Sequence, residues 1–222
     1  MKIDRLVRSN RKTIALIIQK DGTFIVRAPH RLSIQRILDV VKGRQAWIET
    51  QQASIRQSWE AFHRHSFTTG EAFYYLGNIY PLEIVETASQ ALSLDGRFYL
   101  RRRDLPQARQ VFETWYRQRA SEIMTERVGW YAAQYGFSYQ RIRLTSALTR
   151  WGSCNPKGGL NFTWRLVMAP LAVIDNVVVH ELVHTRIRNH SYEFWKQVQN
   201  IFPDYKTCDS WLKQNGPRLN LD

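Results

Sequence analysis

Short apolar runs broken by turn residues dominate the first hundred positions of the chain. The expected strands cover residues 6–7, 13–19, 23–28, 74–75, 79–85, 92–94 and 98–100. The turns expected between them fall at Asp21-Gly22, Leu76-Gly77-Asn78 and Asp95-Gly96. Ser33 can cap a helix over Ile34–Val41, and a second helix follows through Trp47 and Ile55. The pattern predicts a strand-rich first lobe that contains a helix pair.

The hydrophobic period changes in the second half of the chain. Apolar residues recur every three or four positions over 105–135, which predicts one long helix with Asp104 at its cap and Gly136 beyond its end. A second helix is predicted from Pro170 to Asn189, because the run is apolar around its whole axis and longer than ordinary strands. Ser191 can cap the helix that follows.

Candidate chemistry lies in the second of these helices. His180-Glu181-Leu182-Val183-His184 is an H-E-x-x-H sequence, and residues four apart lie on one face of a helix. Both imidazoles can therefore contact one metal ion, with Glu181 placed to act on a water molecule. A catalytic zinc ion takes three protein ligands and leaves one position for water. His190 is the best candidate for the third ligand.

The spacing leaves the class of zinc site open. Five residues separate His184 from His190, as in metzincins, but Ile187 stands where that class has a glycine, and all three methionines lie upstream of the motif. Glu193 is the only glutamate after the motif and is a weaker candidate for a third ligand. One zinc ion is inferred from the type of the ligands alone. Manganese, nickel and cobalt also accept imidazoles and remain alternatives.

Seven segments of the last third form a recognisable set of motifs: Arg150-Trp151-Gly152-Ser153-Cys154, Gly159-Leu160-Asn161, Pro170, the run Val177–His184, Asn189-His190-Ser191, Phe194-Trp195 and Pro203-Asp204-Tyr205. In these segments the chain resembles the YgjP-like metallopeptidases, which are relatives of the SprT-like and WLM groups. The resemblance implies that the three histidines bind zinc, that Glu181 is the general base, and that the segment from Arg150 forms a strand beside the cleft. Asn176 departs from the pattern, since an aromatic residue is expected there.

Together these features predict an α+β fold. A strand-rich basic lobe with a helix pair is expected over residues 1–104. Residues 105–222 are expected to form a long helix, a short strand segment and a minimal zincin-like catalytic part built on the motif helix. The two parts are expected to pack as one compact unit, because 222 residues suit one sizeable domain with an accessory lobe.

The charge of the chain is strongly positive and unevenly spread. Of the formal +13, residues 1–66 hold 13 basic against 5 acidic residues, a balance of +8. Such charge can attract acidic proteins or nucleic acid to the first lobe. No apolar stretch reaches membrane-spanning length and the start lacks the apolar core of a secretory signal, so we expect a cytoplasmic protein with no membrane partner.

Three functions fit these observations. The first is a zinc metallopeptidase that acts on polypeptides, and the second is a zinc phosphohydrolase that acts on nucleoside triphosphates, with arginines holding the phosphates. The third is a nucleic-acid-associated protease of the SprT-like kind. The candidate substrate-binding residues, taken from the arginines and from the motif before the catalytic helix, are Arg150, Trp151, Ser153 and Arg165.

Overall fold

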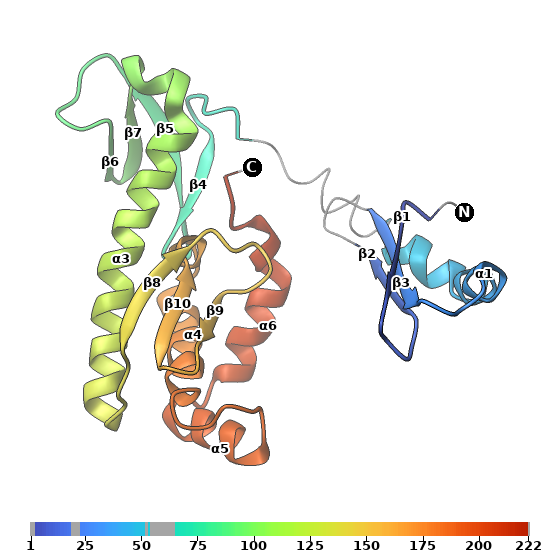
Figure 1. Cartoon of the computed structure of the whole chain (residues 1–222). Coiled ribbons are helices and arrows are strands. Elements are labelled where there is room, and N and C mark those ends of the chain that lie inside the picture. Colours follow the sequence, from blue (N-terminus) through green and yellow to red (C-terminus); the bar gives the residue numbers. More distant parts are fainter. Residues whose placement is uncertain (1–2, 19–22, 52, 54–64, 222) are drawn as a thin grey trace. The chain divides into compact units, whose positions relative to one another are not determined.

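A computed structural model describes residues 3–18, 23–51, 53 and 65–221. The chain divides into two compact units, 1–63 and 64–222. Figure 1 shows the elements of both units. The strands over 72–101 were expected in the first lobe. They lie in the second unit, because their buried side chains share one core with the long helix.

The first unit is a small sheet with a helix packed on it. Strands β1 (Arg5–Ser9) and β2 (Ala15–Ile18) flank β3 (Phe24–Pro29), β1 in parallel and β2 antiparallel. Helix α1 (Ile34–Gly43) begins where Ser33 accepts a hydrogen bond from the Arg36 amide, as predicted, and residues 45–51 are helical. The predicted turn at Asp21-Gly22 and the end of the second helix lie outside the described residues. Six buried residues form the core of this unit: Phe24, Val26, Ala28, Ile37, Val41 and Ile48.

The second unit begins with a four-stranded sheet. It has the order β4-β5-β7-β6, from β4 (Ala72–Tyr75), β5 (Asn78–Val85), β6 (Leu92–Asp95) and β7 (Arg97–Arg101). The predicted turns are present, since Leu76, Gly77 and Gly96 have positive φ angles of 48°, 80° and 66°. Leu76 and Gly77 are the two residues between β4 and β5, and positive φ at both is what a two-residue hairpin turn of this kind requires.

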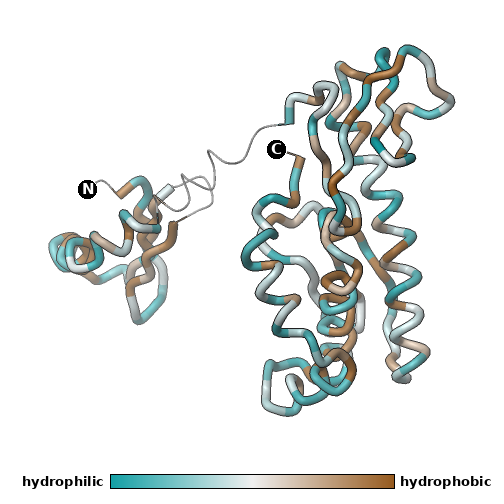
Figure 2. The backbone as a smooth tube through the Cα atoms, turned by 180° about the vertical axis from the view of Figure 1, so that it is seen from behind, coloured by the Kyte–Doolittle hydropathy of each residue, from teal (hydrophilic) through white to brown (hydrophobic). Residues whose placement is uncertain are grey.

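A long helix follows this sheet. A 3₁₀ helix, η1 (Arg102–Gln107), leads into α3 (Ala108–Tyr135), and Gly136 ends α3 in the left-handed conformation at φ 66°. The predicted cap at Asp104 is wrong, because Pro106 lies inside η1 and the α-helix starts later. Asp104 instead pairs with Arg101 at 2.6 Å. Figure 2 shows apolar and polar stretches alternating along α3, as expected for a helix with one buried face.

The rest of the unit is a three-stranded sheet and a group of helices. The sheet has the order β8-β10-β9, from β8 (Arg141–Thr145), β9 (Gly152–Cys154) and β10 (Gly159–Thr163). The helices are η2 (Trp164–Met168), α4 (Leu171–Val183), α5 (Tyr192–Ile201), α6 (Tyr205–Asn215) and η3 (Gly216–Arg218). The described chain is therefore mixed α+β with three small sheets.

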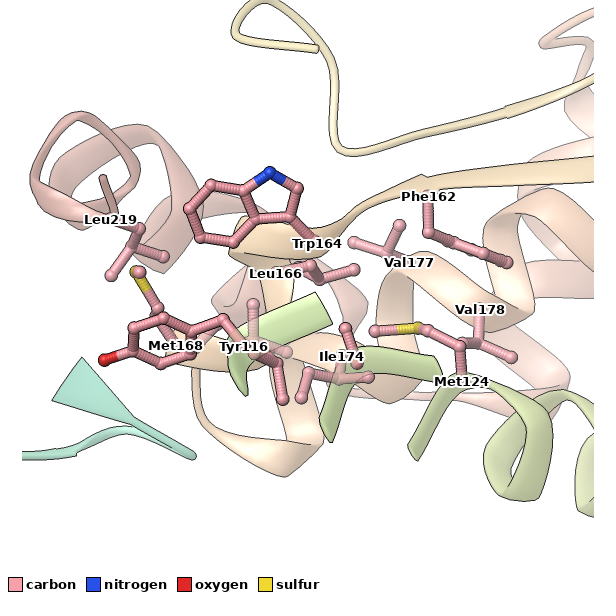
Figure 3. Close-up of a cluster of buried hydrophobic side chains, with 14 of the residues drawn as sticks. Tyr116, Met124, Phe162, Trp164, Leu166, Met168, Ile174, Val177, Val178 and Leu219 are labelled. Carbon is pink, nitrogen blue, oxygen red and sulfur yellow. The ribbon is translucent and has the colours of Figure 1, made fainter. Parts of the chain in front are cut away.

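Helix α4 lies at the centre of this unit and contacts α3, α5, α6 and β9. Figure 3 shows its side chains Ile174, Val177 and Val178 among buried residues such as Met124 and Trp164. The β4–β5 turn fixes the start of α4: the Leu76 amide donates to the Val167 carbonyl at 2.9 Å, and Gly77 lies against Pro170.

The polar residues early in α4 are paired. Arg127 of α3 holds Asp175 through two contacts of 2.6 and 2.8 Å, and Asn176 donates to Asp209 of α6 at 2.9 Å. Asn176, where an aromatic residue was expected, thus contributes a polar contact between two helices. None of the helices in the described residues combines the length and the apolarity that a bilayer-spanning segment needs.

Candidate metal centre

The three histidines singled out in the sequence meet at one point. His180 lies in the last turn of α4, His184 is its C-cap, and His190 precedes the cap of α5. Their Nε2 atoms form a triangle with sides of 3.2 Å (His180 to His184), 3.2 Å (His184 to His190) and 3.1 Å (His190 to His180). Three nitrogen atoms therefore converge from two segments of the chain.

This triangle fits a tetrahedral metal ion. Two imidazole nitrogens at ~2.0–2.1 Å from zinc, at a tetrahedral angle, lie roughly 3.3–3.4 Å apart. The observed spacing is close to that value, and the donors are all of a type that zinc accepts. Burial lowers the pKa of His180 to about 4, with the neighbouring imidazoles adding to the effect, and burial also lowers the pKa of His184. The rings of His180 and His184 are therefore neutral at neutral pH, as metal ligation requires.

A backbone carbonyl sets the tautomer of one imidazole. His184 Nδ1 lies 3.0 Å from the Ile187 carbonyl oxygen, which can only accept, so the ring proton is on Nδ1. The Nε2 atom of that neutral ring then carries a free lone pair.

The motif helix ends earlier than predicted. Helix α4 stops at Val183 and not at Asn189, and no described residue from 184 to 190 has a positive φ. The turn is made instead by hydrogen bonds of the 3₁₀ type. The Thr185 amide donates to the Leu182 carbonyl and the Arg186 amide to the Val183 carbonyl, both at 3.0 Å. These tight turns allow the chain to bring His190 back to the other imidazoles.

A buried phenylalanine supports all three rings. The ring centroid of Phe194 lies 4.9 Å from that of His180, 4.4 Å from His184 and 4.8 Å from His190. Phe194 is inaccessible to solvent, and its amide donates to the Ser191 side chain in the predicted cap of α5. Trp195 stacks on His190 at 5.6 Å. Aromatic packing thus holds the imidazoles on the side of α5.

The carboxyl group of Glu181 has no comparable support. Glu181 is 5% exposed, and its Oε2 atom is buried without a hydrogen-bond partner among the described residues. Burial raises the pKa of Glu181 to about 8, against the opposing charge of Arg150. A buried carboxyl group without a partner is costly, and such groups concentrate at functional sites.

Strand β9 lies against this carboxyl group. A Cβ atom built on Gly152 would lie 2.5 Å from Glu181 Oε1, so the side chain packs directly on the strand backbone. The resemblance implied a strand over the segment from Arg150 to Cys154, and the structure has one over Gly152–Cys154, with Gly152 beside Glu181.

The candidate substrate-binding residues have different surroundings. Arg150 is exposed, and its charge acts on Glu181. Trp151 packs on Gly216 of η3, and Ser153 receives hydrogen bonds from Asn161 on β10. Arg165 is buried in η2, with its guanidinium 4.4 Å from the Trp164 ring and a hydrogen bond to the Ser146 carbonyl. Of the motif residues, Glu181 is the one on which the charge of Arg150 acts.

The sequence was compared with models of known protein families. The family model of the YgjP-like metallopeptidase domain matches residues 12–215. The chain belongs to the YgjP-like family. No significant match was found among curated proteins or among solved structures.

Membership in the YgjP-like family supports an enzyme with metallopeptidase-type activity and implies a divalent metal ion, usually zinc. The match includes most of both compact units, so the basic first unit is part of the family domain and not an unrelated addition. A polypeptide is a fitting substrate class for such a protein.

Sequence reasoning assigned no role to two residues of this YgjP-like site, Gly152 and Phe194. A glycine inside a short strand is a signal of close approach by another group, and it was available in the sequence. The three contacts of Phe194 could not be inferred, because they depend on how α5 packs against α4.

Proposed function

We propose that this protein is a zinc-dependent metallopeptidase, with His180, His184 and His190 as metal ligands and Glu181 as the general base. The observation that carries the proposal is the convergence of three Nε2 atoms within 3.2 Å, together with the buried Glu181 Oε2 atom, which has no hydrogen-bond partner within the described part of the chain. A bound zinc ion would supply Lewis-acid chemistry, polarising the scissile carbonyl and acidifying a water molecule.

Each of the chain's own groups then has a separate task. In its ionised form, the Glu181 carboxylate accepts a proton from the attacking water and delivers it to the leaving nitrogen. The Ile187 carbonyl keeps the Nε2 atom of His184 unprotonated, and Phe194 keeps the three rings in position. Arg150 is our candidate for stabilising negative charge on the substrate oxygen, because its charge already acts at Glu181.

A strand at the edge of its sheet favours a polypeptide substrate. Strand β9 is an edge strand in the sheet of the described residues. The hydrogen bonds from the Asn155 amide to Gly159 and from the Thr163 amide to Trp151 flank it. Because paired residues alternate along an antiparallel ladder, the backbone groups of Gly152 and Cys154 point away from β10. An extended peptide could pair with them.

The alternative phosphohydrolase has less support. Arg101 pairs with Asp104, Arg102 pairs with Glu86, and Arg165 packs on Trp164 inside the second unit. These arginines have structural partners. A nucleic-acid partner for the basic first unit rests on net charge alone and is not part of the proposal.

The test is an assay of zinc-loaded protein on two substrate sets, unfolded polypeptides and nucleoside triphosphates. Wild type and Glu181→Gln are compared, with Glu193→Gln as the matched control, because Glu193 is exposed in the first turn of α5. We expect peptide cleavage that falls by about 10²–10⁴-fold in Glu181→Gln and is unchanged in Glu193→Gln. Release of phosphate with intact polypeptides would show that the reaction is a different one. Loss of zinc in Glu193→Gln would transfer the ligand role to Glu193.

A further inference from the structure

The carboxyl group of Glu181 occupies a space that exists because residue 152 has no side chain. A Cβ atom at Gly152 would lie 2.5 Å from Oε1, 2.7 Å from Cγ and 2.9 Å from Cδ of Glu181. Real Cβ atoms essentially never make contacts this short, so a larger residue at 152 requires either the strand or the glutamate to move. Gly152 has no positive φ, so alanine there would fit the backbone itself.

Strand β9 is held in place at both ends. Trp151 packs on Gly216, where an added Cβ would lie 2.6 Å from the indole ring. At the other end, the Asn155 side chain accepts hydrogen bonds from the Lys157 and Gly159 amides at 2.8 and 3.0 Å. Pairing with β10 fixes the residues between them. The strand therefore cannot retreat easily, and the side chain of Glu181 is the part that must move.

Hydrogen bonds do not oppose such a movement. The Oε2 atom of Glu181 has no partner in the part of the chain that the structure describes. The position of this carboxyl group is therefore determined by packing between α4 and β9. We propose that Gly152 is a positioning residue, whose bare backbone sets where the Glu181 carboxyl group lies relative to the histidine triad.

This inference rests on the proposed function insofar as Glu181 is the general base. A displacement of about 1 Å at a catalytic group can cost roughly 10²-fold in rate. We therefore expect Gly152→Ala to lower kcat by about that factor, while KM for a polypeptide substrate and zinc stoichiometry stay close to those of wild type.

The matched control is Gly129→Ala in α3. A Cβ atom at Gly129 meets no atom within 4 Å, so this variant makes the same chemical change without a clash. We expect its kcat and zinc content to equal those of wild type. Equal activity of Gly152→Ala and Gly129→Ala would overturn the proposal.

A double-mutant cycle on stability tests the contact independently of activity. Overpacking predicts that Gly152→Ala lowers the melting temperature by about 2–10 °C. In the Glu181→Ala background the space is open, and the same substitution should cost little or nothing. An undiminished loss in that background would show that alanine disturbs β9 itself and would overturn the proposal.

The cycle also separates this proposal from the proposed function. If the full-length zinc protein cleaves no peptide but the stability cycle shows the coupling, the packing of Glu181 on Gly152 stands and the peptidase assignment falls. If Glu181→Gln abolishes cleavage but the cycle shows no coupling, the peptidase stands and the role of Gly152 falls.

Discussion

The two halves of α4 each bury a carboxylate, and they treat it in opposite ways. Asp175, in the first half, accepts two hydrogen bonds from Arg127, from Nε at 2.6 Å and from Nη2 at 2.8 Å. Glu181, in the second half, has an oxygen without any partner among the described residues. A bidentate ion pair stabilises one arrangement of two helices, whereas an unpaired buried carboxyl group costs stability. The contrast separates a residue that holds the helix in place from the residue that we propose as the general base.

Catalytic rate should show the largest difference between the two carboxylates. We expect Glu181→Gln to lower kcat by about 10²–10⁴-fold, because a glutamine cannot accept the proton of water. Asp175→Asn should keep kcat per folded molecule within about 2-fold, since Asp175 faces α3. Steady-state kinetics normalised to folded protein would measure both. A large loss of kcat in Asp175→Asn would remove the distinction.

The free energy of unfolding should instead depend strongly on Asp175. Asp175→Ala leaves the guanidinium of Arg127, 19% exposed, without its carboxylate and should cost about 3 kcal/mol in the free energy of unfolding. The double variant Arg127→Met, Asp175→Leu should recover to within about 1 kcal/mol of wild type, because apolar pairs can replace a buried ion pair. Urea denaturation measures both variants. Failure of the double variant to recover would mean that the ion pair itself is required for the fold.

The stabilisation by zinc should depend on the histidine triad and not on Asp175. Zinc at about 100 times its dissociation constant should raise the free energy of unfolding by about 2.7 kcal/mol. His190→Ala should lose most of this gain, because one of three converging nitrogens is gone. Asp175→Ala should keep it. Thermal melts with and without a chelator would test this, and an equal zinc effect in His190→Ala would exclude that residue as a ligand.

The smallest expected effect is a pH dependence around Asp175. Burial raises the pKa of Tyr131 from 10.0 to about 12, the charge of Asp175 adds to the shift and Arg127 opposes it. Below pH 10 the tyrosine is protonated in both states, so its contribution is constant. As pH rises from 10 to 12, the unfolded chain releases the proton first and stability falls. Between pH 10 and pH 11, the free energy of unfolding of Tyr131→Phe should fall by about 1 kcal/mol less than that of wild type. Identical pH profiles would contradict the shift.

The local parts of this site could be predicted from sequence. Two histidines four apart on an apolar helix share a face because of helix geometry, and the cap at Ser191 is a side-chain preference of the same local kind. The turn residues Gly77 and Gly96 were predictable for the same reason.

Features that depend on tertiary packing were missed or misplaced. The end of α4 at Val183 is set by tight turns, anchored where Arg186 donates to the Gly136 carbonyl at 2.6 Å on a different helix. The boundary between the units depends on the packing of β7 side chains against α3 in one core, which the composition of the chain does not reveal. Gly152 was quoted as part of a motif, but its distance from Glu181 depends on how β9 packs on α4.

All three candidate ligands lie within the eleven residues from His180 to His190. The loop that a metal ion closes is therefore short, and its closure entropy is small. The backbone on which Glu181 packs belongs to β9, nearly thirty positions earlier in the chain. If these residues act as proposed, metal binding depends on contacts that are local in the sequence, whereas alignment of the base depends on the packing of β9 against α4. Zinc content alone would then not report the fraction of active enzyme.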